Sequence, residues 1–128
     1  MHYLNILLGL AMLGFAAVQY NDPDALLWTA YYLVPAAWTW VAAFRPQWLS
    51  STQANLALWA SVAAWLGLVV VYWPPMPGFW RPEVFMVEIE GQAAREGMGL
   101  MIAWLTLLVA LFSTRQAAGR SGNRAASI

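Results

Sequence analysis

Four long apolar segments divide the chain, and short polar or proline-rich segments separate them. The first two carry no charged residue, and the fourth begins after a run of charged and amide side chains. Each segment has about the 20 residues that a helix needs to cross roughly 30 Å of hydrocarbon. The pattern therefore predicts four membrane-spanning helices, over about 3–20, 25–44, 52–73 and 92–113.

Prolines indicate where these helices end and where one of them loses a hydrogen bond. Pro46 predicts that the second helix ends at or before Arg45, because a residue that precedes proline avoids the helical conformation. Pro35 lies inside that helix and has no N–H to donate to the carbonyl of Tyr31. We expect a neighbouring helix to supply another donor. The proline-rich segment 74–78 ends the third helix.

Small residues, tryptophans and polar groups within the spans predict how the helices meet. Small residues at helical spacing in the third segment predict a face for close helix contact: Ala57, Ala60, Ala64 and Gly67. Four tryptophans near the predicted membrane interfaces are expected to lie in the headgroup layer: Trp28, Trp48, Trp73 and Trp80. Asn5 and Ser61 lie within spans, where we expect them to form hydrogen bonds between helices.

The predicted fold is an all-α membrane protein in which one domain, 1–113, forms a four-helix transmembrane bundle. A polar tail over 114–128 is expected to be flexible and cytoplasmic. A cleavable signal peptide is the alternative for the first segment, with Ala16 and Ala17 near a cleavage site. No basic residue precedes that segment's apolar core, which favours a retained helix.

Composition supports a membrane protein and excludes several classes of site. Hydrophobic residues make up 62% of the chain and charged residues 9%, against about 45–50% and about 25% in soluble domains. The net charge is zero, so no positive field attracts nucleic acid. The chain has no cysteine, which excludes thiolate metal sites within it. Its single histidine, His2, excludes a bis-histidine haem or a three-histidine zinc site in one chain.

The arginines predict which side of the membrane each connection faces. With four spans both termini lie on one side, which then carries Arg45, Arg115, Arg120 and Arg124. Basic residues favour the cytoplasmic side, so we expect both termini in the cytoplasm and all six acidic residues outside. Every cationic residue is arginine, which is typical of a GC-rich bacterial genome. The expected location is therefore a bacterial inner membrane.

The first polar stretch, 19–24, joins the first two predicted helices. It suits a tight turn, because Asn21 can take the left-handed conformation that ends a helix and Asp22 can cap the next one. Pro23 would then occupy the first helical position, and Asp24 would face the positive end of the helix dipole. The alternative is that Asp24, with Asn21 or Asp22, points inward as a ligand or as the partner of an arginine.

The second polar stretch, 88–96, opens the fourth predicted helix. On a helix, Glu88, Gln92 and Arg95 fall within about 60° of one another, and Glu96 lies beside them. A charge that faces lipid costs on the order of 3 kcal/mol. Arg95 and Glu96 should therefore turn into the bundle and find partners there.

The two stretches are predicted to meet at the outer ends of the helices as one polar cluster, which comprises Asn21, Asp22, Asp24, Glu88, Gln92, Arg95 and Glu96. We expect Arg95 to form a bidentate pair with the carboxylate of Asp22 or Asp24. Nearby glycines would let another backbone approach closely: Gly91, Gly97 and Gly99.

The polar cluster is open to one structural and two chemical interpretations. As a structural element it ties the spans together and needs no cofactor. Its carboxylates could instead bind Ca²⁺, Mg²⁺ or Mn²⁺, which prefer oxygen ligands: Asp22, Asp24, Glu88 and Glu96. A carboxylate pair could also serve acid–base catalysis. The sequence has no serine, cysteine or histidine near these acids, which speaks against a hydrolase.

Two motifs carry a resemblance to a known family. Asn-Asp-Pro-Asp at 21–24 follows the first predicted span, and Arg-Glu-x-x-Gly-Leu at 95–100 opens the last. With both motifs in this order, the chain resembles the transmembrane protein 220 family of small multi-pass membrane proteins over about 19–108. The family places acids closer before the arginine, whereas Gln-Ala-Ala stands here at 92–94. The resemblance implies a multi-helix membrane protein and no particular activity.

The predicted function is that of a non-enzymatic accessory or interaction subunit in the membrane. Its expected partners are the lipid bilayer and other membrane proteins, and no nucleic acid. The first alternative is a divalent-cation-binding sensor or transporter component. The second is a carboxylate-dependent membrane hydrolase.

Overall fold

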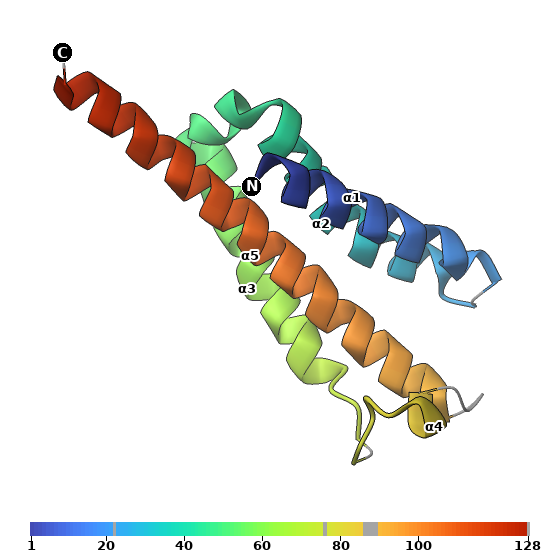
Figure 1. Cartoon of the computed structure of the whole chain (residues 1–128). Coiled ribbons are helices and arrows are strands. Elements are labelled where there is room, and N and C mark those ends of the chain that lie inside the picture. Colours follow the sequence, from blue (N-terminus) through green and yellow to red (C-terminus); the bar gives the residue numbers. More distant parts are fainter. Residues whose placement is uncertain (22, 76, 86–89, 128) are drawn as a thin grey trace.

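A computed structural model of the chain describes residues 1–21, 23–75, 77–85 and 90–127, with side chains over 1–20, 23–75, 77–84 and 91–116. The secondary structure of those ranges is helical and contains no strand, which confirms the all-α part of the predicted fold (Figure 1). The elements are α1 (His2–Ala17), η1 (Val18–Asn21), α2 (Ala25–Phe44), η2 (Pro46–Ser50), α3 (Thr52–Val71), α4 (Pro82–Phe85) and α5 (Glu90–Ser127).

Three helical segments in the described part of the chain are long and apolar enough to cross a membrane: His2–Tyr20, Thr52–Val71 and Gly91–Gln116. Helix α2 has a comparable length of 20 residues and no charge. Its tryptophan, tyrosine, threonine and proline residues lower its mean hydropathy, which keeps it out of that group. The chain is therefore a membrane protein by length and composition of its helices.

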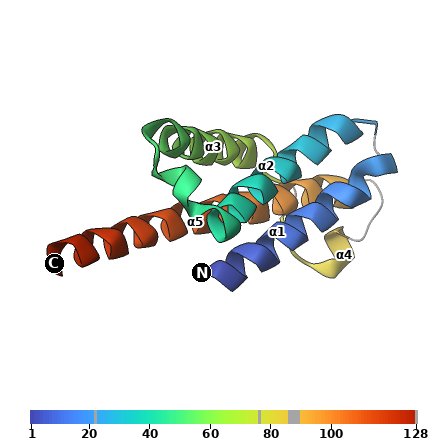
Figure 2. The same ribbon diagram turned by 90° about the horizontal axis from the view of Figure 1, so that it is seen from above.

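Helix α5 is the centre of the arrangement. Helix α1 packs along α2, α2 and α3 both pack on α5, and α1 touches α5 less extensively (Figures 1 and 2). The start of α1, the end of α2, η2 and residues 113–116 of α5 line one small cavity, so these parts share one end of the molecule. The end of α1 and the start of α5 lie together at the other end.

The last helix is longer than the sequence predicts. The apolar segment was expected to end near residue 113, but α5 continues through the polar tail to Ser127. Alanine, glutamine and arginine in that tail are good helix formers. They extend a helix that already exists, so no nucleation cost opposes them.

Helix α2 ends at Phe44, as Pro46 predicts, and its internal proline finds the predicted replacement donor. Pro35 frees the carbonyl oxygen of Tyr31, and the indole Nε1 of Trp65 on α3 donates to that oxygen at 2.9 Å. Apolar lipid offers no donor, so a donor from a neighbouring helix stabilises a carbonyl that would otherwise stay open. Trp65 therefore compensates for Pro35 from the neighbouring helix.

Other side chains also join the helices by hydrogen bonds. The backbones of α2 and α3 make few close approaches, and long tryptophan side chains bridge the space between them. Trp38 donates to the Ser61 hydroxyl at 3.1 Å, which confirms the role predicted for Ser61. Asn5 donates to the Ser113 hydroxyl at 2.9 Å and so joins α1 to α5, as predicted for Asn5. Each such bond in a membrane contributes about 0.6 kcal/mol on average.

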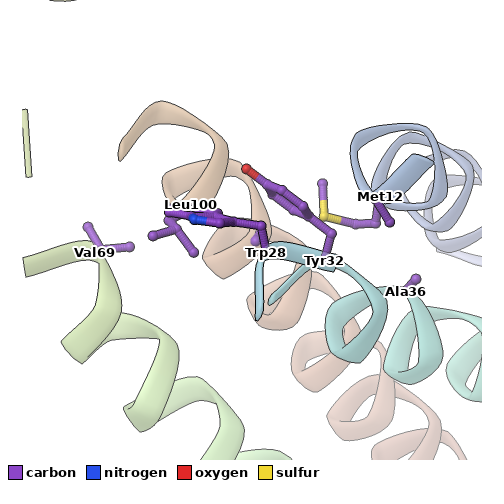
Figure 3. Close-up of a cluster of buried hydrophobic side chains, with 8 residues drawn as sticks. Met12, Trp28, Tyr32, Ala36, Val69 and Leu100 are labelled. Atoms are coloured by element: carbon purple, nitrogen blue, oxygen red, sulfur yellow. The ribbon is translucent and has the colours of Figure 1, made fainter. Parts of the chain in front are cut away.

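The main core lies where α1, α2, α3 and α5 meet, and α2 supplies its aromatic residues. Figure 3 shows Trp28 between Val69 and Tyr32, with the Met12 side chain of α1 extending toward Tyr32. Trp28 is only 4% exposed, so its predicted place in the headgroup layer is wrong. Its ring packs edge-on against Tyr31 and Tyr72, which fixes it inside the bundle. The other three predicted interface tryptophans are exposed: Trp48, Trp73 and Trp80.

The predicted contact face of α3 is also wrong. Its small residues are all exposed: Ala57, Ala60, Ala64 and Gly67. A Cβ added to Gly67 would meet nothing within 4 Å. Helix α3 instead buries Leu58, Val62 and Val69 against α5, because these larger side chains fill the space that its neighbours leave. The small residues lie on the opposite face.

Candidate functional site

A cavity of about 500 Å³ lies where the end of α1 meets the start of α5, and we call it the α1–α5 cavity. Its lining mixes apolar and polar side chains from α1, η1, α2 and α5: Phe15, Val18, Gln19, Tyr32, Gln92, Arg95, Glu96, Met98, Gly99 and Ile102. Gln19 comes from the first polar stretch, whereas Gln92, Arg95 and Glu96 come from the second. Residues far apart in the sequence therefore share this space.

Helical spacing brings the polar residues of α5 to the cavity. Gln92, Arg95 and Gly99 are three and four residues apart, which places them along one side of the helix. Gln92 and Glu96 are also four residues apart, and the Gln92 Nε2 donates to the Glu96 carboxylate at 3.0 Å. That bond orients the carboxylate and leaves it with further capacity to accept hydrogen bonds.

Two glycines of α5 permit close approach, by a backbone at Gly97, as the sequence predicts, and by a side chain at Gly99. A Cβ on Gly97 would lie 2.6 Å from the carbonyl oxygen of Tyr72 and 2.7 Å from the ring of Pro74. A Cβ on Gly99 would collide with the hydroxyl of Tyr32. Tyr32 is buried and lines the cavity, so Gly99 gives its side chain room at the cavity wall.

The turn between α1 and α2 differs from the predicted capping arrangement. Asp24, rather than Asp22, holds the N-cap position of α2, and its exposed side chain makes no capping hydrogen bond. Asn21 ends the 3₁₀ helix η1, and no non-glycine residue in the described part of the chain has a positive φ. The predicted left-handed Asn21 is therefore wrong. The negative charge of Asp24 still lies beside the positive end of the α2 dipole.

The remaining members of the polar cluster fall partly outside the described residues. Asp22 and Glu88 lie outside them, and the side chain of Asn21 is not described. The pairing of Arg95 with Asp22 or Asp24 therefore stays a prediction. Arg95 and Gln92 are exposed at the cavity, and Glu96 is partly buried.

The described residues contain no group of three or more histidine, aspartate or glutamate side chains that could hold a metal ion. Glu96 bonds to Gln92, and Asp24 is exposed at the helix cap. Because Asp22 and Glu88 lie outside the described residues, the predicted Ca²⁺, Mg²⁺ or Mn²⁺ site remains a prediction. None of the cavity residues named above is a serine, threonine, cysteine or histidine.

Sequence reasoning missed the apolar wall of the cavity and Tyr32. Phe15 packs edge-on against Tyr32 at 5.5 Å between ring centroids, which joins α1 to α2 behind the polar residues. Tyr32 follows Trp28 by one helical turn. Gly99 on α5 has no side chain and so leaves space for the Tyr32 hydroxyl. The pairing of a tyrosine with a glycine on another helix leaves no signal in a single sequence.

A second cavity, of about 310 Å³, lies at the other end of the molecule. The Asn5 Nδ2 donates to the carbonyl of Met1 at 3.0 Å and to Ser113. Among the described atoms, the Asn5 Oδ1 is buried and has no partner. The His2 ring contacts the carbonyl of Ala43 at 3.0 Å, far from the polar cluster, as the predicted topology requires.

Comparison with known proteins identifies the family. The family model described as "Transmembrane family 220, helix" matches residues 11–112, a range that runs from the middle of α1 into α5 and includes the α1–α5 cavity. No solved structure matches the chain. The matched range contains both motifs from which the resemblance was predicted. The chain is therefore an integral membrane protein that belongs to transmembrane family 220.

Proposed function

We propose that the protein is a non-enzymatic accessory or interaction subunit whose outer helix ends are tied together by the polar cluster. The observation that carries this proposal is the lining of the α1–α5 cavity, where the amide of Gln19 from the first polar stretch shares one space with polar side chains of the second stretch, including Arg95 and Glu96. The hydrocarbon of the bilayer offers such groups no hydrogen bonds, so below the headgroups they stabilise one another. The cluster then holds the helix ends in place rather than performing a reaction.

In this proposal α2 is a fourth span. Helix α2 is 20 residues long, carries no charge and packs along α1. Several of the polar groups that lower its hydropathy form hydrogen bonds within the protein, such as the Thr39 hydroxyl, which donates to the Ala36 carbonyl at 2.9 Å. The buried indole Nε1 of Trp40 has no such partner among the described atoms. A helix whose polar groups bond internally crosses a membrane at lower cost. The fold is then a four-helix transmembrane bundle.

The proposed orientation places both termini in the cytoplasm of a bacterium, with the protein in the inner membrane. Arg45 lies at the end of α2, and Arg115 lies above the ring of Trp59 on α3 at 5.3 Å. Both arginines belong to the end of the molecule where α1 begins. The positive-inside rule favours that end for the cytoplasm. The α1–α5 cavity then faces the outer leaflet.

The chemistry of the cavity favours a subunit over an enzyme. A hydrolase needs an activated nucleophile or a base held near one. The described lining offers one carboxylate, from Glu96, and the amide of Gln92 already bonds to it. These groups suit recognition and positioning.

Replacement of Arg95 by alanine tests the proposal, with Arg81→Ala as the matched control. Arg81 is exposed next to α4 and is not among the cavity residues. We expect Arg95→Ala to lower the melting temperature in detergent by about 5 °C, because it removes the cluster's guanidinium. We also expect a partner that co-purifies in fixed ratio with the tagged wild-type chain in mild detergent to be lost from Arg95→Ala and retained by Arg81→Ala.

The melting temperature and the recovery of a partner test different parts of the proposal. Equal melting temperatures of Arg95→Ala and Arg81→Ala would contradict the structural role of the polar cluster. Recovery of the wild-type chain alone, with no partner in fixed ratio, would contradict the role as a subunit. Millimolar Ca²⁺ or Mn²⁺ that raised the wild-type melting temperature, and had no effect on Asp24→Asn, would favour the cation-binding alternative instead.

A further inference from the structure

We propose that the α1–α5 cavity binds one phospholipid whose headgroup carries both a phosphate and a primary ammonium, as in phosphatidylethanolamine. The inference deepens the proposed function at the same cavity and rests on the proposed arrangement in the membrane, which puts the cavity at headgroup level. The volume of about 500 Å³ falls in the range of roughly 300–1,000 Å³ that is usual for small-molecule sites.

The cavity opens where two helices separate. Helices α1 and α5 diverge toward η1 and α4 (Figure 1), and α1 packs more extensively on α2 than on α5. Val18 and Ile102 line the cavity and are 68% and 39% exposed, so the cavity is open at its side to the surface that faces lipid. A molecule from the bilayer can therefore enter without crossing the bundle.

One part of the lining suits an acyl chain. Phe15, Val18 and Ile102 form an apolar wall, and Met98 adds a flexible side chain that adapts to irregular ligands. The Tyr32 ring extends this wall into the core. Burying the first methylenes of one chain would contribute about 0.8 kcal/mol for each CH₂. The rest of the lipid would stay in the surrounding leaflet.

The other part of the lining suits a zwitterionic headgroup. The Arg95 guanidinium has five N–H donors in a planar fork that matches phosphate oxygens, and it can serve a phosphate together with a protein partner. The Glu96 carboxylate accepts one bond from Gln92 and can accept an ammonium N–H as well. The described lining thus holds one positive and one negative side chain, adjacent along α5.

That charge pattern discriminates among headgroups. A choline headgroup has the phosphate but no N–H to donate to Glu96. A glycerol headgroup has no positive charge to face the carboxylate. Loss of a charge-assisted hydrogen bond corresponds to a loss in affinity of about tenfold. We therefore expect phosphatidylethanolamine to bind about tenfold more tightly than phosphatidylcholine or phosphatidylglycerol with the same acyl chains.

The purified full-length chain in detergent provides the test, with native mass spectrometry and melting temperature as readouts. Phosphatidylethanolamine should add the mass of one lipid and raise the melting temperature in a saturable way. Glu96→Gln should reduce the preference for ethanolamine over choline to about one, because it removes the carboxylate that distinguishes the two headgroups. Both lipids should still bind, because the headgroup phosphate still contacts Arg95. Glycerophosphoethanolamine, which lacks acyl chains, should have little effect at the same concentration.

A steric variant tests the place of binding. Ile102→Trp should fill the cavity from its exposed rim and abolish the mass increase of one lipid. Leu105→Trp is the matched control, because Leu105 is 54% exposed and is not among the cavity residues. Equal binding of the three lipids to the wild type, or a preference for phosphatidylglycerol, would overturn the proposal. So would wild-type lipid binding by Ile102→Trp. In those cases the wild-type chain could still recover its partner, and Arg95→Ala could still lower the melting temperature. The proposed function would then stand, and only the lipid assignment would fail.

Discussion

Tryptophan indole N–H groups donate to backbone carbonyls of neighbouring helices in this bundle. The Trp65 indole N–H reaches the carbonyl that Pro35 leaves open, and the Trp104 indole N–H donates to the carbonyl of Val62 at 3.1 Å. In hydrocarbon such a donor matters more than the ring's packing alone, because no water can take its place. Tryptophan thus contributes both apolar surface and a long-range donor to this protein.

At this scale we predict coupling between Trp65 and Pro35. Trp65→Phe should lower stability by about 0.6–1.7 kcal/mol, because it leaves the Tyr31 carbonyl open. In a Pro35→Ala background the same change should cost less, because the substituted residue restores the backbone N–H that the Tyr31 carbonyl accepts within the helix. Reversible unfolding of the four proteins measures the coupling.

Trp48→Phe is the control for that cycle, because Trp48 is 61% exposed. It should have the same small effect in both backgrounds. Additive effects of Trp65→Phe and Pro35→Ala would contradict the compensating hydrogen bond.

Helix α5 determines how the other helices are arranged, since it contacts α1, α2, α3 and α4. Its glycines sit where other parts of the chain come closest. Gly97 faces the Tyr72 carbonyl and the Pro74 ring, which connect α3 to α4. Neither a backbone carbonyl nor a proline ring can turn aside as a flexible side chain can.

We therefore predict that Gly97→Ala destabilises the protein by roughly 1–3 kcal/mol, as overpacking does in other cores. Gly67→Ala is the matched control on α3, because a Cβ there would meet nothing within 4 Å. It should raise stability by about 0.5–1 kcal/mol, because alanine favours the helix. Unfolding of both variants in the same detergent compares them, and a Gly97→Ala protein as stable as the wild type would contradict the close contact.

The sequence predicts which segments are helical far better than which face of each helix is buried. Charge-free runs and prolines identify α1, α2 and α3, and Pro35 predicts the partner that Trp65 provides. Helix α3 is apolar all round, so its small residues and its larger ones were equally plausible contact faces. Trp28 was assigned to the headgroup layer because it lies near a predicted membrane interface. A tryptophan at that depth can face either the lipid or the core of the bundle. Rotation about the helix axis depends on neighbours that a single sequence does not identify.

The candidate site follows the same rule. The second polar stretch lies on α5, where helical spacing alone places Gln92 and Arg95 along one side. Gln19 and Tyr32 reach the cavity through the packing of α1 and α2, which spacing does not predict. Helical periodicity therefore predicted the cavity residues on α5. The cavity residues on the other helices could be identified only from the folded structure.

In the proposed arrangement of the whole molecule α2 crosses the membrane, so that four spans place the α1–α5 cavity outside and both termini inside. With three spans only, α2 would stay on the outer side and the later connections would exchange sides. The chain contains no cysteine, so single cysteines report position without background. Ser50 in η2 and Glu83 in α4 are exposed and lie in the two diagnostic connections.

The most direct measurement is labelling of Ser50→Cys and Glu83→Cys in intact spheroplasts with a membrane-impermeant maleimide. We expect Glu83→Cys to react at once and Ser50→Cys to react only after the membrane is permeabilised. Labelling of Ser50→Cys from outside, with Glu83→Cys protected, would contradict the arrangement of four spans with both termini in the cytoplasm.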